Sequence, residues 1–420
     1  MKTPPRRSGA LPLLLATVAI GGVLAGTTAH ARVKLGIDVL LDSRIELVAG
    51  KRVGLVTNAS GVDGALTPTV DRIASDKRVK LVQIFAPEHG LRGALANGDG
   101  GGDYVDPDTR VPVEGLFGKR SEPSAEALKR VDVVLFDIQD IGSRTYTYIT
   151  TLGKVMTAAG RAKVPVIVLD RPNPHGGLVF EGAIRAPKYK SLIGWAPIPV
   201  THGMTMGELA RFYNEEMGLK CDLTVVEMEG WQRWMRWEDT GLQWVPTSPG
   251  IPHTLNAYMY VATGMVGGAG TNINEGGGNS QPFELMGAPF FEPKKLAAAL
   301  NAEGLDGVFF RPMTYRPRYG KRTGQLLHGV QLMLIDPRKF RPLRTALVLL
   351  TTIQRMYPKD FEVKNEKLFG RVWGNDDILA MLRKGRSWKK IEASWQDELT
   401  AFGQKRAKHL IYPEGTYAAP

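Results

Sequence analysis

Short apolar runs that end in polar clusters recur along the first half of the chain. Val, Ile, Leu and Phe dominate these runs, a pattern that predicts strands buried on both faces of a parallel sheet. The runs lie at residues 52–57, 79–85, 131–136, 164–169 and 222–228. Between them the apolar spacing is helical, around residues 70–74, 149–156 and 205–212. Strands that alternate with helices predict an α/β fold with a doubly wound parallel sheet.

The pattern changes after Ile251. Glycines crowd residues 264–278, and a mixture of elements follows them. Helices are predicted near residues 294–300, 343–356 and 376–383, and strands around 308–311 and 329–335. A last helix is predicted to carry Ile391, Trp395, Leu399 and Phe402 on one face. We therefore expect an α/β domain at residues 32–245 and a smaller C-terminal α+β domain at residues 246–420 that closes a cleft between them.

The first 31 residues have the organisation of a signal peptide. Lys2, Arg6 and Arg7 precede an apolar stretch at residues 11–24, and Ala29-His30-Ala31 fits a small-x-small cleavage site. The apolar stretch is shorter than the roughly 20 residues that a membrane-spanning helix needs. We expect an exported protein, periplasmic or secreted, with no stable membrane insertion.

Composition and charge limit the kinds of molecule that the protein is expected to bind. The chain has 43% hydrophobic and 23% charged residues, which is ordinary for a folded domain. A net charge of +12 suits anionic polymers of the cell envelope. The basic residues are scattered and no nucleic-acid-binding motif accompanies them, so no nucleic-acid partner is expected. Cys221 is the single cysteine, which excludes an intrachain disulfide.

Phosphate-binding glycine motifs are missing at the strand exits. The first strand runs into Thr57-Asn58-Ala59-Ser60-Gly61 rather than a G-x-G-x-x-G turn, and no P-loop follows any strand. A nucleotide would therefore lack its usual glycine-lined helix start. We expect no cofactor.

Polar residues that can carry chemistry follow three of the predicted strands. In an open α/β sheet, ligands bind in the crevice outside the carboxyl ends of the strands. These residues are therefore expected to converge on one crevice. They are Glu88, His89 and Arg92 after the second strand, Gln139, Asp140 and Arg144 after the third, and Asp170, Arg171, Asn173 and His175 after the fourth.

Glu88 is the candidate general acid. A glutamic acid between an apolar strand and a second domain is desolvated, which favours the protonated form that donates to a leaving oxygen. The alternative for Glu88 is a surface loop residue beside a capping histidine. For Asp140 and Asp170 the alternative is simple ion pairing with Arg144 and Arg171.

A metal site is the other use for such side chains. Oxygen and imidazole ligands could come from Glu88, His89, Asp137, Asp140, His175 and His202. No recognised ligand spacing such as H-E-x-x-H occurs, so no metal is expected. Trp231, Trp234 and Trp237, at a spacing of three, fit packing along a helix face better than a sugar-stacking platform.

Seven sequence blocks resemble those of one enzyme family. They read FAPEHGLRG, VPVEGLFG, FDIQDIGSRTYTYI, VIVLDRPNPHGG, PVTHGMTMGELA, TSPGIP and GTNINEGGGNSQPFELMGAP, in order, between about Gly36 and Tyr412. The chain is similar to the exo-β-N-acetylmuramidase (NamZ-like) family, formerly a domain of unknown function. Its members release N-acetylmuramic acid from the non-reducing ends of peptidoglycan fragments.

The resemblance implies a Rossmann-like domain with a smaller domain beside it and the active cleft between them. The family's proposed catalytic glutamate falls on Glu88. Asp140, Glu275 and Glu284 are candidates for a second catalytic group, with Asp140 preferred, and Arg144 and Arg171 for binding the lactyl carboxylate. Residues expected to contact the glycan are Asn58, His89, Arg92, Gln139, Arg144, Tyr146, Asp170, Arg171, Asn173, His202, Asn272, Glu275 and Glu284.

The glycine-rich block departs from the family pattern, which typically reads E-G-T-N-x-S-E-G-R-G-T. The leading Glu is Ala269, and the Ser, Arg and Thr are Asn274, Gly277 and Asn279. Glycan contacts on the C-terminal side of the cleft are therefore expected to differ. A non-catalytic cell-wall glycan-binding protein on the same fold is the alternative function.

Overall fold

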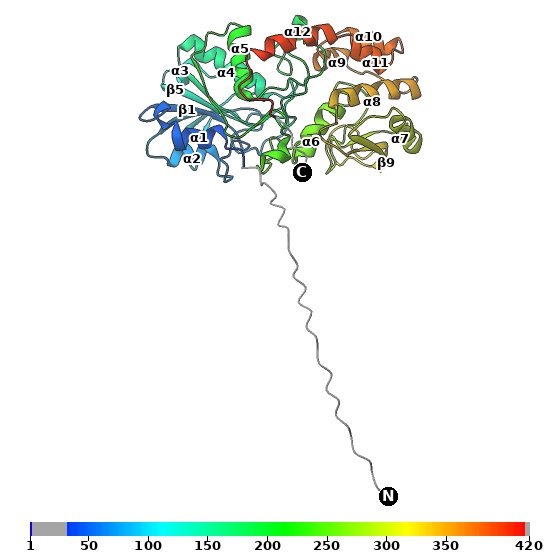
Figure 1. Cartoon of the computed structure of the whole chain (residues 1–420), viewed down its shortest axis with the longest axis horizontal. Coiled ribbons are helices and arrows are strands. Elements are labelled where there is room, and N and C mark those ends of the chain that lie inside the picture. The colour runs from blue at the N-terminus through cyan, green and yellow to red at the C-terminus, as the bar shows by residue number, and fades with distance from the viewer. Residues whose placement is uncertain (2–31, 416–420) are drawn as a thin grey trace.

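The computed structural model describes Met1 and residues 32–415 (Figure 1). The predicted signal peptide, apart from Met1, lies outside the described residues. Across the described part of the chain, none of the helices combines the length and apolar character needed to cross a membrane.

The N-terminal domain is built on a seven-stranded sheet. Its strands are β1 Arg52–Thr57, β2 Lys80–Ala86, β3 Tyr104–Val105, β4 Pro112–Gly115, β5 Val133–Asp137, β6 Val166–Leu169 and β7 Leu223–Val226. Their order is β3-β4-β2-β1-β5-β6-β7. All neighbouring pairs are parallel except the short edge pair of β3 with β4. The predicted α/β fold with a doubly wound sheet is confirmed.

The strand order places a switch point at the middle of the sheet. From β1 the chain proceeds outward through β2 to β4, and then returns to β5 on the other side of β1. Loops that leave the carboxyl ends of β1 and β5 therefore diverge, and a crevice opens between them. Asn58 and Ile138 begin these two loops, and Pro87 begins the loop after the neighbouring strand β2.

Helices cover both faces of this sheet. They are α1 Gly36–Ser43, α2 Thr69–Ser75, α3 Ala125–Leu128, α4 Tyr148–Ala162 and α5 Met206–Glu216, with 3₁₀ turns at Ile45–Leu47, Pro187–Tyr189 and Trp237–Thr240. Apolar residues of α3, α4 and α5 pack on one face, and those of α1 and α2 on the other. The α5 start is the predicted capping box, in which Thr205 Oγ1 accepts from the Glu208 N–H and Glu208 Oε2 accepts from the Thr205 N–H.

The C-terminal domain has an antiparallel sheet in the order β8-β10-β9. Its strands are β8 Leu285–Ala288, β9 Val308–Tyr315 and β10 Leu327–Leu334. Its helices are α6 Thr254–Met259, a π-helical turn Tyr260–Gly264, α7 Pro293–Asn301, α8 Pro342–Met356, α9 Glu366–Trp373, α10 Asp377–Arg383, α11 Trp388–Ala393 and α12 Gln396–Ala407. This is the smaller α+β unit that the sequence predicts.

Two local predictions were wrong. The single last helix is two helices, α11 and α12, because the chain turns at Ser394, whose hydroxyl bonds back to the Ile391 carbonyl oxygen. The tryptophans at positions 231, 234 and 237 are buried, as expected for packing. They do not share one helix face, because Trp231 and Trp234 lie on an irregular segment and Trp237 begins a 3₁₀ turn.

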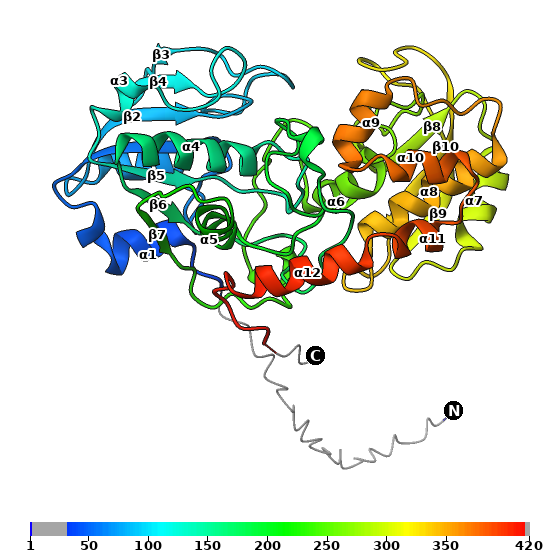
Figure 2. The same ribbon diagram turned by 90° about the horizontal axis from the view of Figure 1, so that it is seen from above.

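The two domains share one hydrophobic core. A single cluster of buried side chains extends from α4 and α5 through α6 and α8 to α12. Helix α12 runs back from the C-terminal domain towards α5 (Figure 2). Beyond it, the Tyr412 hydroxyl donates to Asp170 Oδ2 at 2.6 Å. This hydrogen bond therefore links the segment after α12 to the N-terminal domain.

Candidate active site

Glu88 leaves the sheet in a tight, buried turn after β2. The turn places two consecutive residues, His89 (φ 73°) and Gly90 (φ 73°), in the left-handed region. The His89 N–H donates to the Asp99 carbonyl oxygen at 2.8 Å, and its Nδ1 lies 3.0 Å from the Leu95 carbonyl oxygen. A non-glycine residue in this conformation is strained and is held only by such surrounding contacts. The turn therefore fixes the direction of Glu88 and ties it to the glycine-rich loop.

The Glu88 carboxylate is half-buried and has one partner for each oxygen. The Gly98 N–H donates to Oε1 at 2.8 Å, and the Thr147 hydroxyl donates to Oε2 at 2.8 Å. Gly98 belongs to the loop of residues 90–108, and Thr147 precedes α4. The loop thus contacts the carboxylate. The neighbouring side chains of His89 and Arg92 are engaged elsewhere.

Three tyrosines join the two domains beside Thr147, the residue that binds Glu88. The Tyr146 ring makes edge-to-face contacts with Tyr148 at 4.9 Å and Tyr260 at 5.7 Å between centroids. The Tyr146 hydroxyl donates to Thr247 Oγ1 at 2.9 Å, and the Tyr148 hydroxyl donates to the Thr247 carbonyl oxygen. Tyr146 and Tyr148 come from the first domain, and Tyr260 from the turn after α6.

Three acidic groups from distant parts of the chain act on Tyr260. Burial, and then the negative charges of Glu88, Asp140 and Glu275, raise the pKa of Tyr260 to about 12. The candidate acid and two of the three candidates for the second group therefore all influence the pKa of this one hydroxyl. At neutral pH this hydroxyl stays protonated.

Asp140 is buried, and one of its carboxylate oxygens lacks a hydrogen-bond partner among the described residues. Its Oδ2 accepts the Gly142 N–H at 2.6 Å, and amides of Ile141 and Ser143 also stabilise the carboxylate. Its Oδ1 has no hydrogen-bond partner in the described structure. Burial raises the pKa of Asp140 to about 7. This carboxyl can therefore exchange a proton near neutral pH.

The other two carboxyl candidates lie in the C-terminal domain. Burial raises the pKa of Glu275, and the Lys321 ammonium, 3.8 Å from Glu275 Oε2, opposes that rise. Glu284 has both oxygens occupied, by the Asn256 amide at 3.1 Å and by the Gln281 amide at 3.4 Å. Of this pair, Glu275 is the one whose charge acts on Tyr260.

The departures in the glycine-rich block reshape the wall beside Glu275. Asn274 holds the loop, because its amide donates to the Gly277 and Lys321 carbonyl oxygens and its Oδ1 accepts the Gly276 N–H. A Cβ atom at Gly277 would meet only Glu275 Oε1, at 3.9 Å. The position where the family carries arginine is thus open space next to a carboxylate.

The two arginines expected to bind the lactyl carboxylate, Arg144 and Arg171, both have partners within the protein. Arg144 is fully buried, and its guanidinium donates to the carbonyl oxygens of Ala183, Ile198 and Val372. Burial lowers the pKa of Arg144 to about 9. Neither terminal nitrogen is free to bind a substrate.

Arg171 forms a buried ion pair with Asp137. Its Nε lies 2.5 Å from Asp137 Oδ1 and its Nη2 lies 2.9 Å from Oδ2. The alternative expectation, in which Asp140 pairs with Arg144 and Asp170 pairs with Arg171, is therefore wrong. The side chain of Asp170 instead accepts from Thr205, Gly207 and Tyr412, and burial raises its pKa to about 6.

Five more predicted contact residues make hydrogen bonds or ion pairs within the protein, although Gln139 Oε1 and His202 Nε2 have no partner among the described residues. The Gln139 amide donates to the carbonyl oxygens of Asp140 and Pro172, and the Asn173 amide to that of Met204. His202 Nδ1 accepts the Met204 N–H, and Arg92 pairs with Asp71, Asp106 and Asp108. Asn272 bonds the backbone of Asp360 and Glu362. These side chains shape the loops around the site.

Asn58 remains at the site. Its Oδ1 accepts from the Ser60 N–H and hydroxyl, and its side chain also bonds the Tyr148 hydroxyl. Thr147, Tyr148, Thr247 and Tyr260 were missed by sequence reasoning. Thr147, Tyr148 and Thr247 fall in blocks that carry the family resemblance, which is the signal that could have found them.

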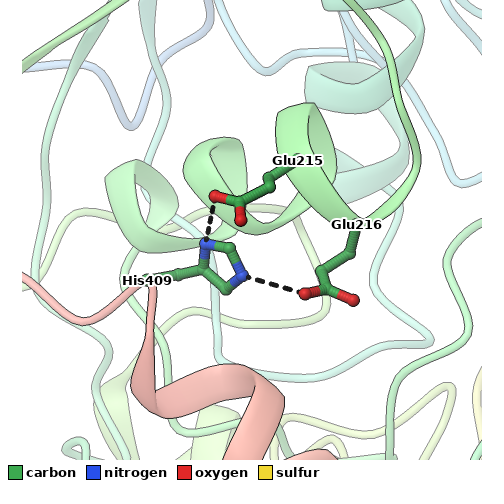
Figure 3. A group of neighbouring side chains, drawn as sticks. All are labelled: Glu215, Glu216 and His409. Atoms are coloured by element: carbon green, nitrogen blue, oxygen red, sulfur yellow. Dashed lines mark hydrogen bonds and ion pairs between the residues drawn. The ribbon is translucent and has the colours of Figure 1, made fainter.

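One group of side chains within residues 32–415 has spacing that could suit a metal ion, and it lies away from this site. It comprises Glu215 and Glu216 on α5 and His409 beyond α12 (Figure 3). The carboxylates face different ring nitrogens, with Glu215 Oε2 3.8 Å from Nδ1 and Glu216 Oε1 3.4 Å from Nε2. In the structure, the two contacts link α5 to the C-terminal segment.

Comparisons with known proteins cover both domains. The family model described as exo-β-N-acetylmuramidase NamZ, N-terminal, matches residues 53–255, and the corresponding C-terminal model matches residues 258–412. The peptidoglycan β-N-acetylmuramidase NamZ of Bacillus subtilis (strain 168) is 44% identical over 386 residues, 92% of this chain and 93% of that protein.

Two solved structures from Bacteroides fragilis, both DUF1343 family proteins, have the same fold. One aligns with a TM-score of 0.85 at 37% identity and the other with 0.72 at 26%. Each alignment covers 91% of this chain and 99% of the other.

Proposed function

Because this chain belongs to the exo-β-N-acetylmuramidase NamZ family, we propose that it is an exo-acting glycoside hydrolase. Its substrates are peptidoglycan fragments, from whose non-reducing ends it releases terminal N-acetylmuramic acid. The reaction belongs to cell-wall turnover. As proposed, it uses carboxyl groups and water.

The position of Glu88 carries this proposal. It is a half-buried carboxyl at the sheet's ligand-binding edge, contacted by the loop of residues 90–108, and its charge acts on a tyrosine of the other domain. Oxocarbenium-like cleavage needs a proton donor close to the leaving oxygen. Glu88 is the carboxyl proposed for this role.

In the proposed reaction, Glu88 donates its proton to the glycosidic oxygen as the bond from that oxygen to C1 of muramic acid breaks. A water molecule adds to C1, and its proton passes to a base. Asp140 is the proposed second carboxyl, since one oxygen is unused and its charge acts at Tyr260, as that of Glu88 does. Glu284 is a weaker candidate because both of its oxygens already accept amide hydrogen bonds.

Export belongs to the same proposal. A muramidase that works on cell-wall fragments must meet them in the envelope, and the n-region, apolar stretch and Ala29-His30-Ala31 site supply an export signal. The mature protein is then expected to begin at Arg32 and to be periplasmic or secreted. Amino-terminal sequencing of protein from the envelope of the native host tests this, and a start at Met1 would overturn it.

The activity is tested on protein comprising residues 32–420. The substrates are 4-nitrophenyl β-N-acetylmuramide and a disaccharide of N-acetylmuramic acid linked to N-acetylglucosamine, with products identified by mass spectrometry. Release of free N-acetylmuramic acid from the non-reducing end is expected, and the 4-nitrophenyl glycoside of N-acetylglucosamine serves as the comparison. Binding of the disaccharide without turnover would favour the non-catalytic glycan-binding alternative and overturn the proposal.

A further inference from the structure

Tyr260 is placed at the domain junction by an irregular helix. Helix α6 ends at Met259, and the chain continues in a π-helical turn from Tyr260 to Gly264. Such turns are rare and frequently lie at functional sites, because the wider turn redirects the side chains that follow. Here the turn carries a tyrosine of the C-terminal domain into contact with the N-terminal domain.

Two ring contacts orient the Tyr260 side chain. Its ring packs edge-to-face on Tyr146 at 5.7 Å and on Phe283 at 4.9 Å between centroids. Phe283 itself has φ 65°, an unusual conformation for an aromatic residue, and its carbonyl oxygen accepts from Thr263 within the π-helical turn. The ring is therefore fixed from both sides, and the direction of the hydroxyl is fixed with it.

The Tyr260 hydroxyl is held much more loosely than its neighbours. It accepts from the Thr145 hydroxyl and donates to the Thr145 carbonyl oxygen, each at 3.4 Å. The hydroxyls of Tyr146 and Tyr148 make bonds of 2.9 Å and 2.5 Å. Bonds at the long end of the range are weak. The Tyr260 hydroxyl can therefore donate instead to an acceptor that is better placed.

We propose that Tyr260 is a further catalytic residue, whose hydroxyl donates a hydrogen bond to an oxygen of the terminal muramic acid residue and holds that sugar against Glu88. This inference rests on the proposed function. With a pKa of about 12, the Tyr260 hydroxyl is a much poorer proton donor than a carboxyl and is not the acid. It can donate a hydrogen bond to a hydroxyl, acetamido or carboxylate oxygen of the sugar and so position that sugar, which an ionised carboxylate cannot do because it only accepts.

Tyr260→Phe tests the inference, because it removes the hydroxyl and keeps the ring contacts. We expect kcat/KM to fall about 10- to 100-fold, the range for losing one hydrogen-bond donor at a reacting substrate. The fall is expected mainly in kcat, and equally for leaving groups of low and high pKa, since the hydroxyl acts on the sugar and not on the leaving oxygen. Rates are referred to the folded fraction measured by circular dichroism.

Tyr258→Phe is the matched control on the same helix. Tyr258 is buried, and its hydroxyl donates to the Pro174 carbonyl oxygen at 3.1 Å and to Glu238 at 2.7 Å. Its loss is expected to lower the melting temperature and leave kcat/KM of the folded protein unchanged.

The outcomes separate the two proposals. If the wild-type protein is active and Tyr260→Phe has the same kcat/KM, the proposed role of Tyr260 is overturned. A loss that grows with the pKa of the leaving group would place the hydroxyl at the leaving oxygen and overturn it as well. If the wild-type protein releases no N-acetylmuramic acid, the proposed function falls, and this inference falls with it.

Discussion

The Thr147 hydroxyl donates a hydrogen bond of 2.8 Å to Glu88 Oε2. This bond joins the loop after β2 to the start of α4, two elements that are far apart in the sequence. It orients the carboxyl that we propose as the acid, and its other oxygen is fixed by the Gly98 N–H. Both contacts yield predictions.

Glu88→Gln should abolish most hydrolysis of natural glycans. The amide keeps the shape of the side chain but cannot donate the proton, so we expect a loss of about 10²–10⁴-fold for poor leaving groups. An aryl glycoside with a leaving group of low pKa should lose less. Glu126→Gln, at an exposed position of α3, is the control and should behave as wild type. Near wild-type turnover by folded Glu88→Gln would exclude Glu88 as the acid.

Thr147→Val should reduce activity by roughly tenfold, since it leaves one carboxylate oxygen without its donor and the acid less well oriented. Thr157→Val is the matched change on the same helix. The Thr157 hydroxyl bonds only the Gly153 carbonyl oxygen of its own turn, so this variant should keep full activity. Steady-state kinetics on the disaccharide distinguish the two, and equal rates would contradict an orienting role for Thr147.

Asp140→Asn should change how stability depends on pH. The pKa of Asp140 is about 7 in the folded protein, above its ordinary 3.8, so the native state binds the proton more tightly than the unfolded state. The free energy of unfolding of the wild type should therefore fall as pH rises from about 4 to 7. The asparagine variant lacks this fall. Between pH 5 and pH 8 its free energy of unfolding should therefore rise relative to that of the wild type by on the order of a few kcal/mol.

Asp132→Asn gives the opposite comparison. Hydrogen bonds from Arg52 lower the pKa of Asp132 to about 2, so its stabilising effect is present above pH 4 and is lost as pH falls further. Urea unfolding between pH 3 and pH 8 separates the variants. An unchanged pH slope in Asp140→Asn would show that the carboxyl is not strongly desolvated.

Arg144→Ala should destabilise the fold rather than alter substrate preference. Its guanidinium joins three carbonyl oxygens, including that of Val372 in the second domain. Loss of a buried charged network costs roughly 3–5 kcal/mol, whereas Arg161→Ala, which breaks an exposed pair with Glu122, should cost less than about 1 kcal/mol. Urea unfolding gives the stabilities. If the folded fraction of this variant had a changed preference for muramic acid over N-acetylglucosamine, Arg144 would instead have a role in substrate binding.

Local chemistry determined much of this protein from the sequence. The apolar run at Arg52–Thr57 is β1, and the Thr205–Glu208 capping box begins α5, because strand burial and helix capping depend on neighbours a few positions away. Glu88 could be located for the same reason. A charged residue directly after a buried strand must lie at the edge of the sheet, whatever the rest of the chain does.

Only the tertiary structure decided which strand-end residues line the site. Arg144, Arg171 and Glu88 all follow predicted strands, but the two arginines satisfy buried carbonyl and carboxylate oxygens. Glu88 is only half-buried and accepts from Gly98 and Thr147. Tyr260 gave no local signal, because a π-helical turn and packing on Tyr146 set its direction. Contacts between residues far apart in the chain depend on how two domains meet, and no periodicity within either segment encodes that.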